Sequence, residues 1–358
     1  MFDIVVLLIA IFTAMASAIV GVFLVLRKMS MMTDAISHTV LLGIVLVYMI
    51  VKDLSSPYLV IGATLMGLIT TYLIELLIKT KTTKEDAATG VVFPLLFSIA
   101  VVIISLDFRG VHLDIDAVLT GNLEWASMMN LYIMIGIFII NLLFFIIFYK
   151  ELKIVSFDAA LATVLGISPI IIHYLLMGLV SLTAVTAFDA VGSILVIALM
   201  VGPAMTALLF TKNLLKTTVT AMVIGVFNSI LGYFIALLLD ISIAGVIAST
   251  TLIVFLIALF FNPKKGVITS VVKRNKQQKD FAIITLMVHI KNHQNTEKAH
   301  IETSLNHLHQ ELNWSKKYFM KRFKKAQQKG YLHQTDENVT LSILGEKHLS
   351  DQMTYYSL

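Results

Sequence analysis

The stretch "IVVLLIAIFTAMASAIVGVFLVLRK", residues 4–28, decides the class of this protein. The run Ile4–Leu26 carries no charge, and a helix needs about 20 apolar residues to cross the hydrocarbon core of a bilayer. No basic residue precedes the run, and it ends at Arg27 and Lys28 rather than at a small-residue cleavage site. The stretch is therefore expected to be a retained transmembrane helix and not a cleaved signal peptide.

The whole chain is more apolar than a soluble domain. Of its 358 residues, 58% are hydrophobic and 14% are charged, and the mean hydropathy is +0.88, whereas soluble domains are about half apolar and a quarter charged. Runs of the length of a membrane span predict nine helices: Ile4–Leu26, Asp34–Val51, Tyr58–Ile78, Ala87–Leu106, Leu131–Tyr149, Pro169–Ala187, Val191–Phe210, Val219–Leu239 and Ile243–Phe261. The expected fold class is an all-α polytopic membrane protein.

The basic residues between these spans are distributed unevenly. Eleven lie in alternate loops, and only Lys52 and Arg109 lie in the intervening loops. The eleven are Arg27, Lys28, Lys79, Lys81, Lys84, Lys150, Lys153, Lys212, Lys216, Lys264 and Lys265. Because Lys and Arg accumulate in cytoplasmic loops, we expect the N-terminus outside and the C-terminus in the cytoplasm.

The composition changes abruptly at "FNPKKG", residues 261–266. From Gly266 onward the chain carries 14 of its 27 basic residues and 8 of its 22 acidic residues, a net charge of +6. The excess positive charge of the protein therefore belongs to its C-terminal part. We expect a membrane domain at 1–263, a linker at 264–280 and a small basic α+β domain in the cytoplasm at 281–358.

The C-terminal domain resembles a winged helix-turn-helix. Apolar spacings of three and four predict helices over Phe281–Lys291, Ala299–Leu312 and Trp314–Lys329, and "TDEN", residues 335–338, predicts a hairpin. The third helix carries a basic cluster of Lys316, Lys317, Lys321, Arg322, Lys324 and Lys325. Such a helix is typical of nucleic-acid binding. Contact with anionic membrane lipid or a partner subunit is favoured instead, because a membrane-tethered domain has poor access to DNA.

One pair of ionisable residues stands out in the second predicted span. Asp34 and His38 are four residues apart, so they share one face of a helix. Ionisable residues inside a membrane are costly and mark ion routes, and a carboxylate with an imidazole suits Mn²⁺, Fe²⁺ or Zn²⁺. With no cysteine in the sequence, thiolate ligands are excluded. Alternatively, Asp34 caps the helix and His38 forms a hydrogen bond within the bundle.

Five stretches, in order, resemble the permease subunits of ATP-binding-cassette metal-ion importers, the manganese, zinc and iron uptake family. They are "RKMSMMTDAISHTVLLGI" (27–44), "KEDAATGVVFPLLFSIAVVIISL" (84–106), "VHLDIDAVLTGN" (111–122), "SFDAALATVLGISPIIIHYLLMGLVSLTAV" (156–185) and "DAVGSILVIALMVGPAMTALL" (189–209). The resemblance covers about residues 1–263 and implies the fold of a type II importer. It also implies a homodimer in a bacterial cell membrane, served by a separate cytoplasmic ATPase and an extracellular metal-binding lipoprotein.

The resemblance implies that Asp34 and His38 contribute to the route of the transported ion. Two ligands cannot complete a coordination shell, so water, other side chains or the second copy must supply the rest. Asp189 is a further candidate ligand, or equally an interfacial residue at a helix turn. His173 is expected to be packed or hydrogen-bonded, and the external residues His112, Asp114 and Asp116 are weak candidates to receive a cation. Manganese is the expected ion, with zinc or iron as alternatives and no permanent cofactor.

The segment "SFDAALATVLGIS", residues 156–168, resembles the helix that couples such permeases to their ATPase. Asp158 is placed to cap a short helix, Gly166 to end it, and Phe157 and Leu161 to contact the ATPase; an ordinary amphipathic connector is the alternative. The chain has no phosphate-binding G-x-x-x-x-G-K-[ST] motif, so it is expected to transport without being an enzyme.

Two other functional classes compete with the ATP-driven importer. The first is a secondary transporter, which needs no ATPase. The second is a membrane-tethered regulator, although nine spans exceed what an anchor needs. The C-terminal domain could sense metal through the five histidines between residues 289 and 309, which are His289, His293, His300, His307 and His309, although surface histidines are more often unliganded.

Overall fold

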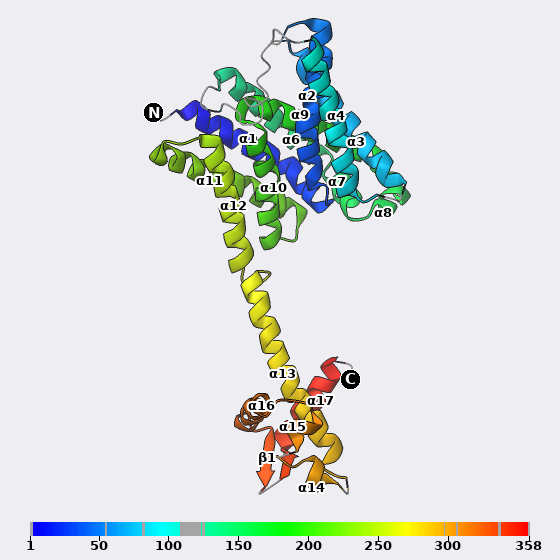
Figure 1. Ribbon diagram of the computed structural model, residues 1–358, viewed down its shortest axis with the longest axis vertical. Helices are drawn as coiled ribbons and strands as arrows, with labels where there is room; N and C mark the ends of the chain where they lie inside the picture. Colours follow the sequence, from blue (N-terminus) through cyan, green and yellow to red (C-terminus); the bar gives the residue numbers. More distant parts are fainter. Residues whose placement is uncertain are drawn as a thin grey trace. The chain divides into compact units, whose positions relative to one another are not determined.

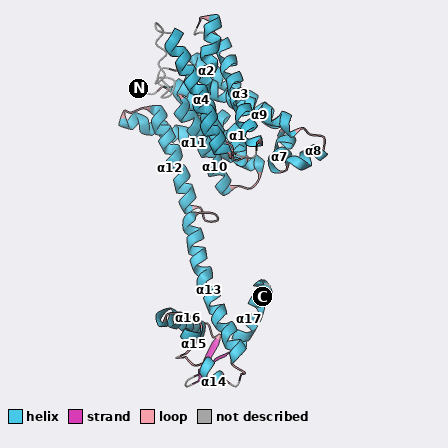
Figure 2. Ribbon diagram, turned by 45° about the vertical axis from the view of Figure 1, so that its right-hand side comes forward, coloured by secondary structure: helices cyan, strands magenta, loops and turns pink. Residues whose placement is uncertain are grey.

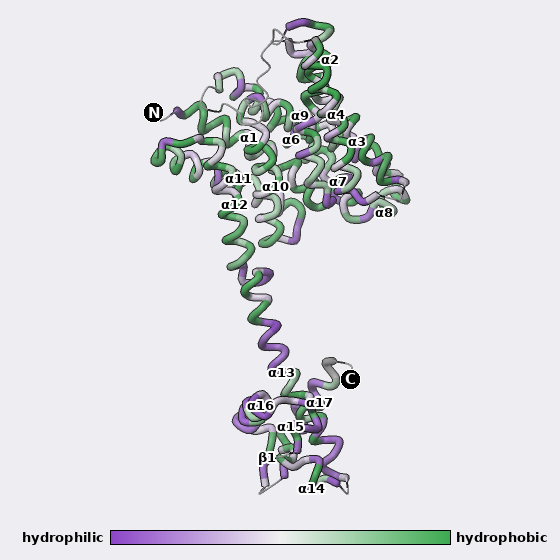
Figure 3. Tube along the Cα trace, in the orientation of Figure 1, coloured by the Kyte–Doolittle hydropathy of each residue, from purple (hydrophilic) through white to green (hydrophobic). Residues whose placement is uncertain are grey.

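The computed structural model describes residues 3–53, 56–80, 83–107, 123, 126–296, 298–305, 307–335 and 338–356. The chain divides into two compact units, Met1–Asn262 and Pro263–Leu358. Hydrophobic residues dominate the helices of the first unit, whereas hydrophilic residues are frequent in the second (Figure 3). The first unit is called the membrane unit below, and the second the C-terminal unit.

The membrane unit is built from helices (Figure 1). In chain order they are α1 Ile4–Leu26, α2 Ser30–Val51, α3 Tyr58–Lys79, α4 Glu85–Asp107, α6 Met128–Ile147, α7 Tyr149–Phe157, α8 Ala159–Val164, α9 Pro169–Val191, α10 Ser193–Phe210, α11 Leu214–Leu239 and α12 Ile243–Phe261. Among the described residues, nine of these helices are long and apolar enough to cross a membrane, all except α7 and α8. The predicted class, a helical protein with nine candidate spans, is confirmed.

Some helix ends differ from the prediction. The second span begins at Ser30 rather than Asp34, because Lys28 adopts a left-handed conformation with φ +62° and turns the chain directly from α1 into α2. The boundary between α9 and α10 is Gly192, whose φ of +84° is accessible mainly to glycine. Both turns are local backbone events that hydropathy does not report.

Helix α1 lies at the centre of the membrane unit, in contact with α6, α9, α10 and α11. Small residues let the backbones approach closely. A Cβ atom added at Gly21 would collide with the backbone of Met200 on α10, and one added at Gly225 on α11 would lie 3.2 Å from the Cβ of Ala14. Small residues at such crossings are the usual means of close packing between membrane helices.

A second group of helices positions the Asp34–His38 face. Helix α2 packs against α3 through Gly43 and Gly62, where an added Cβ at Gly43 would lie 2.5 Å from the carbonyl oxygen of Gly62. Thr70 Oγ1 on α3 donates a hydrogen bond to Thr39 Oγ1 on α2 at 2.8 Å. Helix α2 also contacts α4, so it packs against two neighbouring spans.

The C-terminal unit is a small α+β structure whose only strands, among the residues described, form one hairpin (Figure 2). Its elements are α13 Val267–His293, α14 Ala299–Glu302, α15 Leu308–Glu311, α16 Lys316–Gln328, β1 Leu332–Thr335, β2 Asn338–Leu341 and α17 Ile343–Tyr356. Leu332 pairs with Leu341 and Thr335 with Asn338 across the antiparallel hairpin. The buried core joins Met287 of α13 to Phe319 and Phe323 of α16.

The structure corrects three expectations for this unit. The segment 264–280, expected as a linker, is mostly the first half of α13, because no Gly or Pro occurs between Gly266 and Gly330. The helix expected over Ala299–Leu312 is two single turns, since Ser304 leaves the helical path to bridge Asn338. Helix α17 was not predicted; the Ser342 hydroxyl accepts the N–H of Gly345 at its start.

Candidate metal site and coupling segment

Asp34 and His38 lie one turn apart on α2. His38 Nε2 is 3.7 Å from Asp34 Oδ1, and the side chains are 28% and 41% exposed, respectively. Because α2 begins at Ser30 with Met29 as its cap, Asp34 lies inside the helix, and the alternative that its carboxylate caps α2 is wrong. The pair therefore presents an oxygen and a nitrogen donor together on the side of a candidate membrane span.

Two aromatic rings of α4 hold the His38 imidazole. The ring of Phe93 stacks on it at a centroid distance of 5.3 Å, and Phe97 meets it edge-on at 5.8 Å. These contacts orient the ring without using its nitrogen atoms, so Nε2 remains directed toward Asp34. Within the described residues, no group of three or more His, Asp or Glu side chains is arranged to hold a metal ion. Asp34 and His38 thus form at most a partial coordination shell.

The structure does not bring Asp189 to this pair. An added Cβ at Gly67 on α3 would touch both Ser181 on α9 and Ile36 on α2, so those two residues lie at the same level. Asp189 lies eight residues beyond Ser181, which is about 12 Å further along α9. There it is exposed, and its Oδ2 accepts a hydrogen bond from Asn130 Nδ2 at 3.3 Å. The candidates His112, Asp114 and Asp116 fall outside the described residues.

His173 belongs to a network of ionisable groups that joins α1, α3, α7 and α9. Its Nε2 contacts Glu75 Oε1, and Glu75 Oε2 accepts a hydrogen bond from Tyr174 at 2.8 Å. Arg27 Nη1 lies 3.3 Å from His173 Nδ1, and Arg27 Nε donates to Ser156 Oγ at 3.3 Å. The expectation that His173 is hydrogen-bonded is confirmed.

The network favours one tautomer of the His173 ring. Guanidinium groups only donate, so Nδ1 of His173 must accept from Arg27, which leaves the ring proton on Nε2 facing Glu75. Burial lowers the pKa of Arg27 to about 10, so this side chain is still charged at neutral pH. Arg27 and Glu75 were not singled out from the sequence, although a carboxylate inside a predicted span is a signal that could have found Glu75.

The segment after α7 forms a short helix with defined ends. Asp158 Oδ1 accepts the N–H of Leu161 at 2.9 Å and caps α8. At the other end Gly166 has φ +79°, its N–H donates to Thr163, and the N–H of Ile167 donates to Ala162 at 2.9 Å. This is the pattern of a glycine-terminated helix.

The end of α7 and helix α8 expose apolar side chains. Phe157 is 63% exposed, Leu161 48% and Val164 83%. Apolar residues clustered on a short capped helix are typical of a docking surface. Because Ser156, which contacts Arg27, immediately precedes Phe157, this surface is adjacent in sequence to the His173 network.

Comparison with known proteins identifies the membrane unit. The sequence profile described as the ABC 3 transport family matches residues 2–262. The chain belongs to the ABC 3 transport family. Members of this family are transport components of the cell membrane, so the chain is a multi-pass permease and not an enzyme.

Two curated relatives of this ABC 3 permease have the same sequence identity to it, 40%. The zinc transport system membrane protein TroD of Treponema pallidum (strain Nichols) is 40% identical over 321 residues, covering 87% of this chain and 88% of TroD. The manganese transport system membrane protein MntD of Bacillus subtilis (strain 168) is 40% identical over 276 residues, covering 74% of this chain and 93% of MntD. The relatives support transport of a transition-metal ion.

A solved structure has the same fold as the membrane unit of this ABC 3 permease. A chain of PsaBC from Streptococcus pneumoniae, solved in complex with Fab, matches with a TM-score of 0.64 and 33% identity, over 73% of this chain and 91% of that one. The sequence of TroD also aligns with part of the C-terminal unit. The TroD alignment covers 87% of this chain, so it reaches beyond residue 262, and TroD shares part of the C-terminal unit.

Proposed function

We propose that this ABC 3 permease imports manganese, with Asp34 and His38 as ligands of the ion in transit. The carboxylate–imidazole pair on α2, 3.7 Å apart beside Phe93 and Phe97, is the observation that carries this proposal. Carboxylate and water ligands suit Mn²⁺, whereas zinc sites favour tetrahedral shells rich in nitrogen and sulfur. Zinc, as named for TroD, and iron are the alternative ions.

A partial shell fits a transported ion better than a resident one. Two donors hold a divalent cation loosely and leave most positions to water, to side chains exposed in another conformation or to a second copy of the permease. An ion in transit must also leave, which a closed shell would prevent. The exposed fractions of Asp34 and His38 are consistent with access from a water-filled route.

The energy source in this proposal is a separate ATPase subunit that docks on α8. The cap of Asp158, the turn at Gly166 and the exposed side chains of Phe157 and Leu161 support that role. The eleven basic residues of alternate loops support a cytoplasmic position for α8 and the C-terminus, with the N-terminus outside. An extracellular metal-binding lipoprotein would deliver the ion to a homodimer of this chain.

The C-terminal unit is proposed to be a winged-helix-like regulator of transport. Its helices α13 and α16 pack together and are followed by the β1–β2 hairpin, which is the order of a winged helix. His289 and His293 on α13 have ring centroids 4.5 Å apart, and His293 Nδ1 is 2.7 Å from Glu302. In this proposal cytoplasmic metal contacts His289 or His293 with water as its other ligands, since no described group of three His, Asp or Glu side chains is arranged to hold an ion.

Uptake of radioactive manganese by cells lacking their own importers tests the function. We expect uptake only when the permease is expressed together with its ATPase, and competition by excess unlabelled manganese at lower concentrations than by zinc or iron. Uptake by the permease alone would instead identify a secondary transporter. Stronger competition by zinc would assign zinc as the ion.

A further inference from the structure

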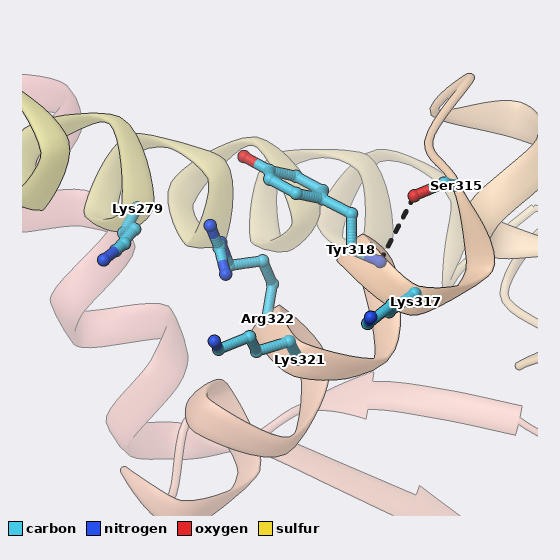
Figure 4. Close-up of a pocket in the computed structure, with 6 residues that line it drawn as sticks. All are labelled: Lys279, Ser315, Lys317, Tyr318, Lys321 and Arg322. Carbon is cyan, nitrogen blue, oxygen red and sulfur yellow. Dashed lines mark hydrogen bonds between the residues drawn. The ribbon is translucent and has the colours of Figure 1, made fainter.

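A pocket of about 300 Å³ lies between α13 and the first turns of α16 in the C-terminal unit (Figure 4). Its lining residues are Lys279, Ser315, Lys317, Tyr318, Lys321 and Arg322. Four of the six are cationic and none is acidic. Figure 4 shows the charged ends of Lys279, Lys321 and Arg322 directed toward the same space. Because positive side chains this close together repel one another, a negatively charged ligand in the pocket would relieve that repulsion.

Arg322 is the central residue of this pocket. Its side chain is almost fully buried, with 8% exposed, and the Tyr318 ring lies 4.3 Å from its Cζ atom. Its buried Nε has no hydrogen-bond partner among the described residues. Burying a guanidinium with an unpaired N–H is unfavourable, and the cation–π contact offsets only part of that cost. An anion in the pocket would offset the uncompensated positive charge of the guanidinium.

Asp280, the acidic residue beside the pocket, forms ion pairs with two lysines that do not line the pocket. Asp280 follows Lys279 on α13, but its Oδ1 lies 3.6 Å from Lys325 Nζ and 3.9 Å from Lys329 Nζ. Helix α16 also begins at the pocket, where Ser315 Oγ accepts the N–H of Tyr318 at 3.3 Å. The positive end of that helix dipole adds to the attraction of an anion.

We propose that this pocket binds a phosphate group, with Arg322 as the forked donor and Lys279, Lys317 and Lys321 as surrounding charges. A guanidinium with several ammonium groups matches an oxyanion of more than one negative charge. The phosphate can belong to a phospholipid headgroup or to a soluble phosphate compound. A nucleic-acid duplex fits less well, because the buried Arg322 lies in a concavity and cannot reach base edges in a groove.

Calorimetry on the full-length permease in phosphatidylcholine nanodiscs tests the proposal. The probes are inorganic pyrophosphate and water-soluble dihexanoylphosphatidic acid, whose phosphomonoester can carry more than one negative charge. We expect saturable binding of at least one, weakened about tenfold by Arg322→Gln because a charge-assisted bond is lost. The double variant Lys317→Gln/Lys321→Gln changes exposed residues only and is expected to weaken binding without affecting the fold. Lys347→Gln, an exposed lysine of α17 outside the pocket, is the matched control and should bind as the unmodified protein does.

The two probes separate the sources of the phosphate. Tighter binding of the lipid would assign a headgroup, and tighter binding of pyrophosphate would assign a soluble compound. Two results would overturn the proposal. One is the absence of saturable binding of both probes, or binding that the double variant leaves unchanged. The other is that the protein binds a DNA duplex, and that this binding is weakened by Lys324→Gln but not by the pocket variants.

Discussion

Arg27 Nη1 lies 3.3 Å from His173 Nδ1, although the two residues are 146 positions apart in the sequence. Arg27 follows the last residue of α1, and His173 lies in the first turns of α9. The other nitrogen of His173 contacts Glu75 of α3, and Arg27 also bonds Ser156 of α7. One hydrogen-bonded chain therefore connects three candidate spans to the segment that precedes α8.

Loss of His173 is expected to destabilise the permease. His173→Ala leaves Glu75 and Arg27 half-paired in a partly buried site, which costs about 3 kcal/mol. Tyr174→Phe removes a single hydrogen bond to Glu75 and should cost about 1 kcal/mol. The midpoint of thermal unfolding of the purified protein in detergent measures both. Equal midpoints for the two variants would show that His173 does not hold the network together.

The two ends of α8 are expected to be required for coupled transport. Gly166→Val forces a β-branched residue to φ +79°, which costs about 1 kcal/mol or more, and Asp158→Ala removes a cap of about 1 kcal/mol. Both should lower manganese uptake at unchanged membrane abundance. Gly136→Ala in helix α6 is the control, since its added Cβ would lie more than 4 Å from every atom outside the adjacent backbone of that helix. Cysteines at 158–166 that never crosslink to the ATPase, while other loops do, would refute docking here.

The membrane unit is expected to transport without the C-terminal unit. Truncation after Lys265 keeps all nine candidate spans and the basic residues of the loops. The shortened chain should insert and take up manganese, with altered dependence on the internal metal load. Uptake measured across a range of loads checks this expectation. Complete loss of uptake at normal membrane abundance would make the C-terminal unit structural, and identical uptake at every load would remove its regulatory role.

The region around Glu302 is expected to loosen in acid. The hydrogen bond from His293 holds the pKa of the Glu302 carboxyl below its usual value of 4.5. A depressed pKa stabilises the folded state above the usual value, and this contribution is lost as the pH falls through the lowered pKa. Hydrogen exchange around residue 302, corrected for its intrinsic pH dependence, should rise below pH 4.5. Glu302→Gln should abolish the rise and Glu346→Gln should retain it; the reverse would exclude this pair as its origin.

The sequence predicted the spans well because hydropathy over about 20 residues is a strong and local signal. It also predicted the caps of α8 at Asp158 and Gly166, which are determined within a few residues. Contacts between distant segments were not predictable in this way. The Arg27–His173 contact joins residues 146 positions apart, and no periodicity relates them.

Local features misled the prediction where tertiary contacts decide the structure. Ser304 breaks the expected helix over Ala299–Leu312 because it pairs with Asn338 of the later hairpin. The separation of Asp189 from Asp34 depends on the level at which α2 and α9 pack against Gly67, which no local pattern reports; a ligand role for Asp189 elsewhere on the ion route stays a prediction. Only the folded chain separates Asp189 from the pair on α2.

The initial rate of manganese uptake by Asp34→Asn and His38→Phe tests the central claim most directly. His38→Phe keeps an aromatic ring against Phe93 and Phe97 while removing both nitrogen donors. Asp86→Asn, an exposed carboxylate in the first turn of α4, is the control. At equal membrane abundance, we expect the two site variants to lose uptake by about 100-fold, since even indirect partners of metal ligands typically contribute 10- to 100-fold, with the control unchanged. An unreduced rate for either site variant would contradict a ligand role for that residue.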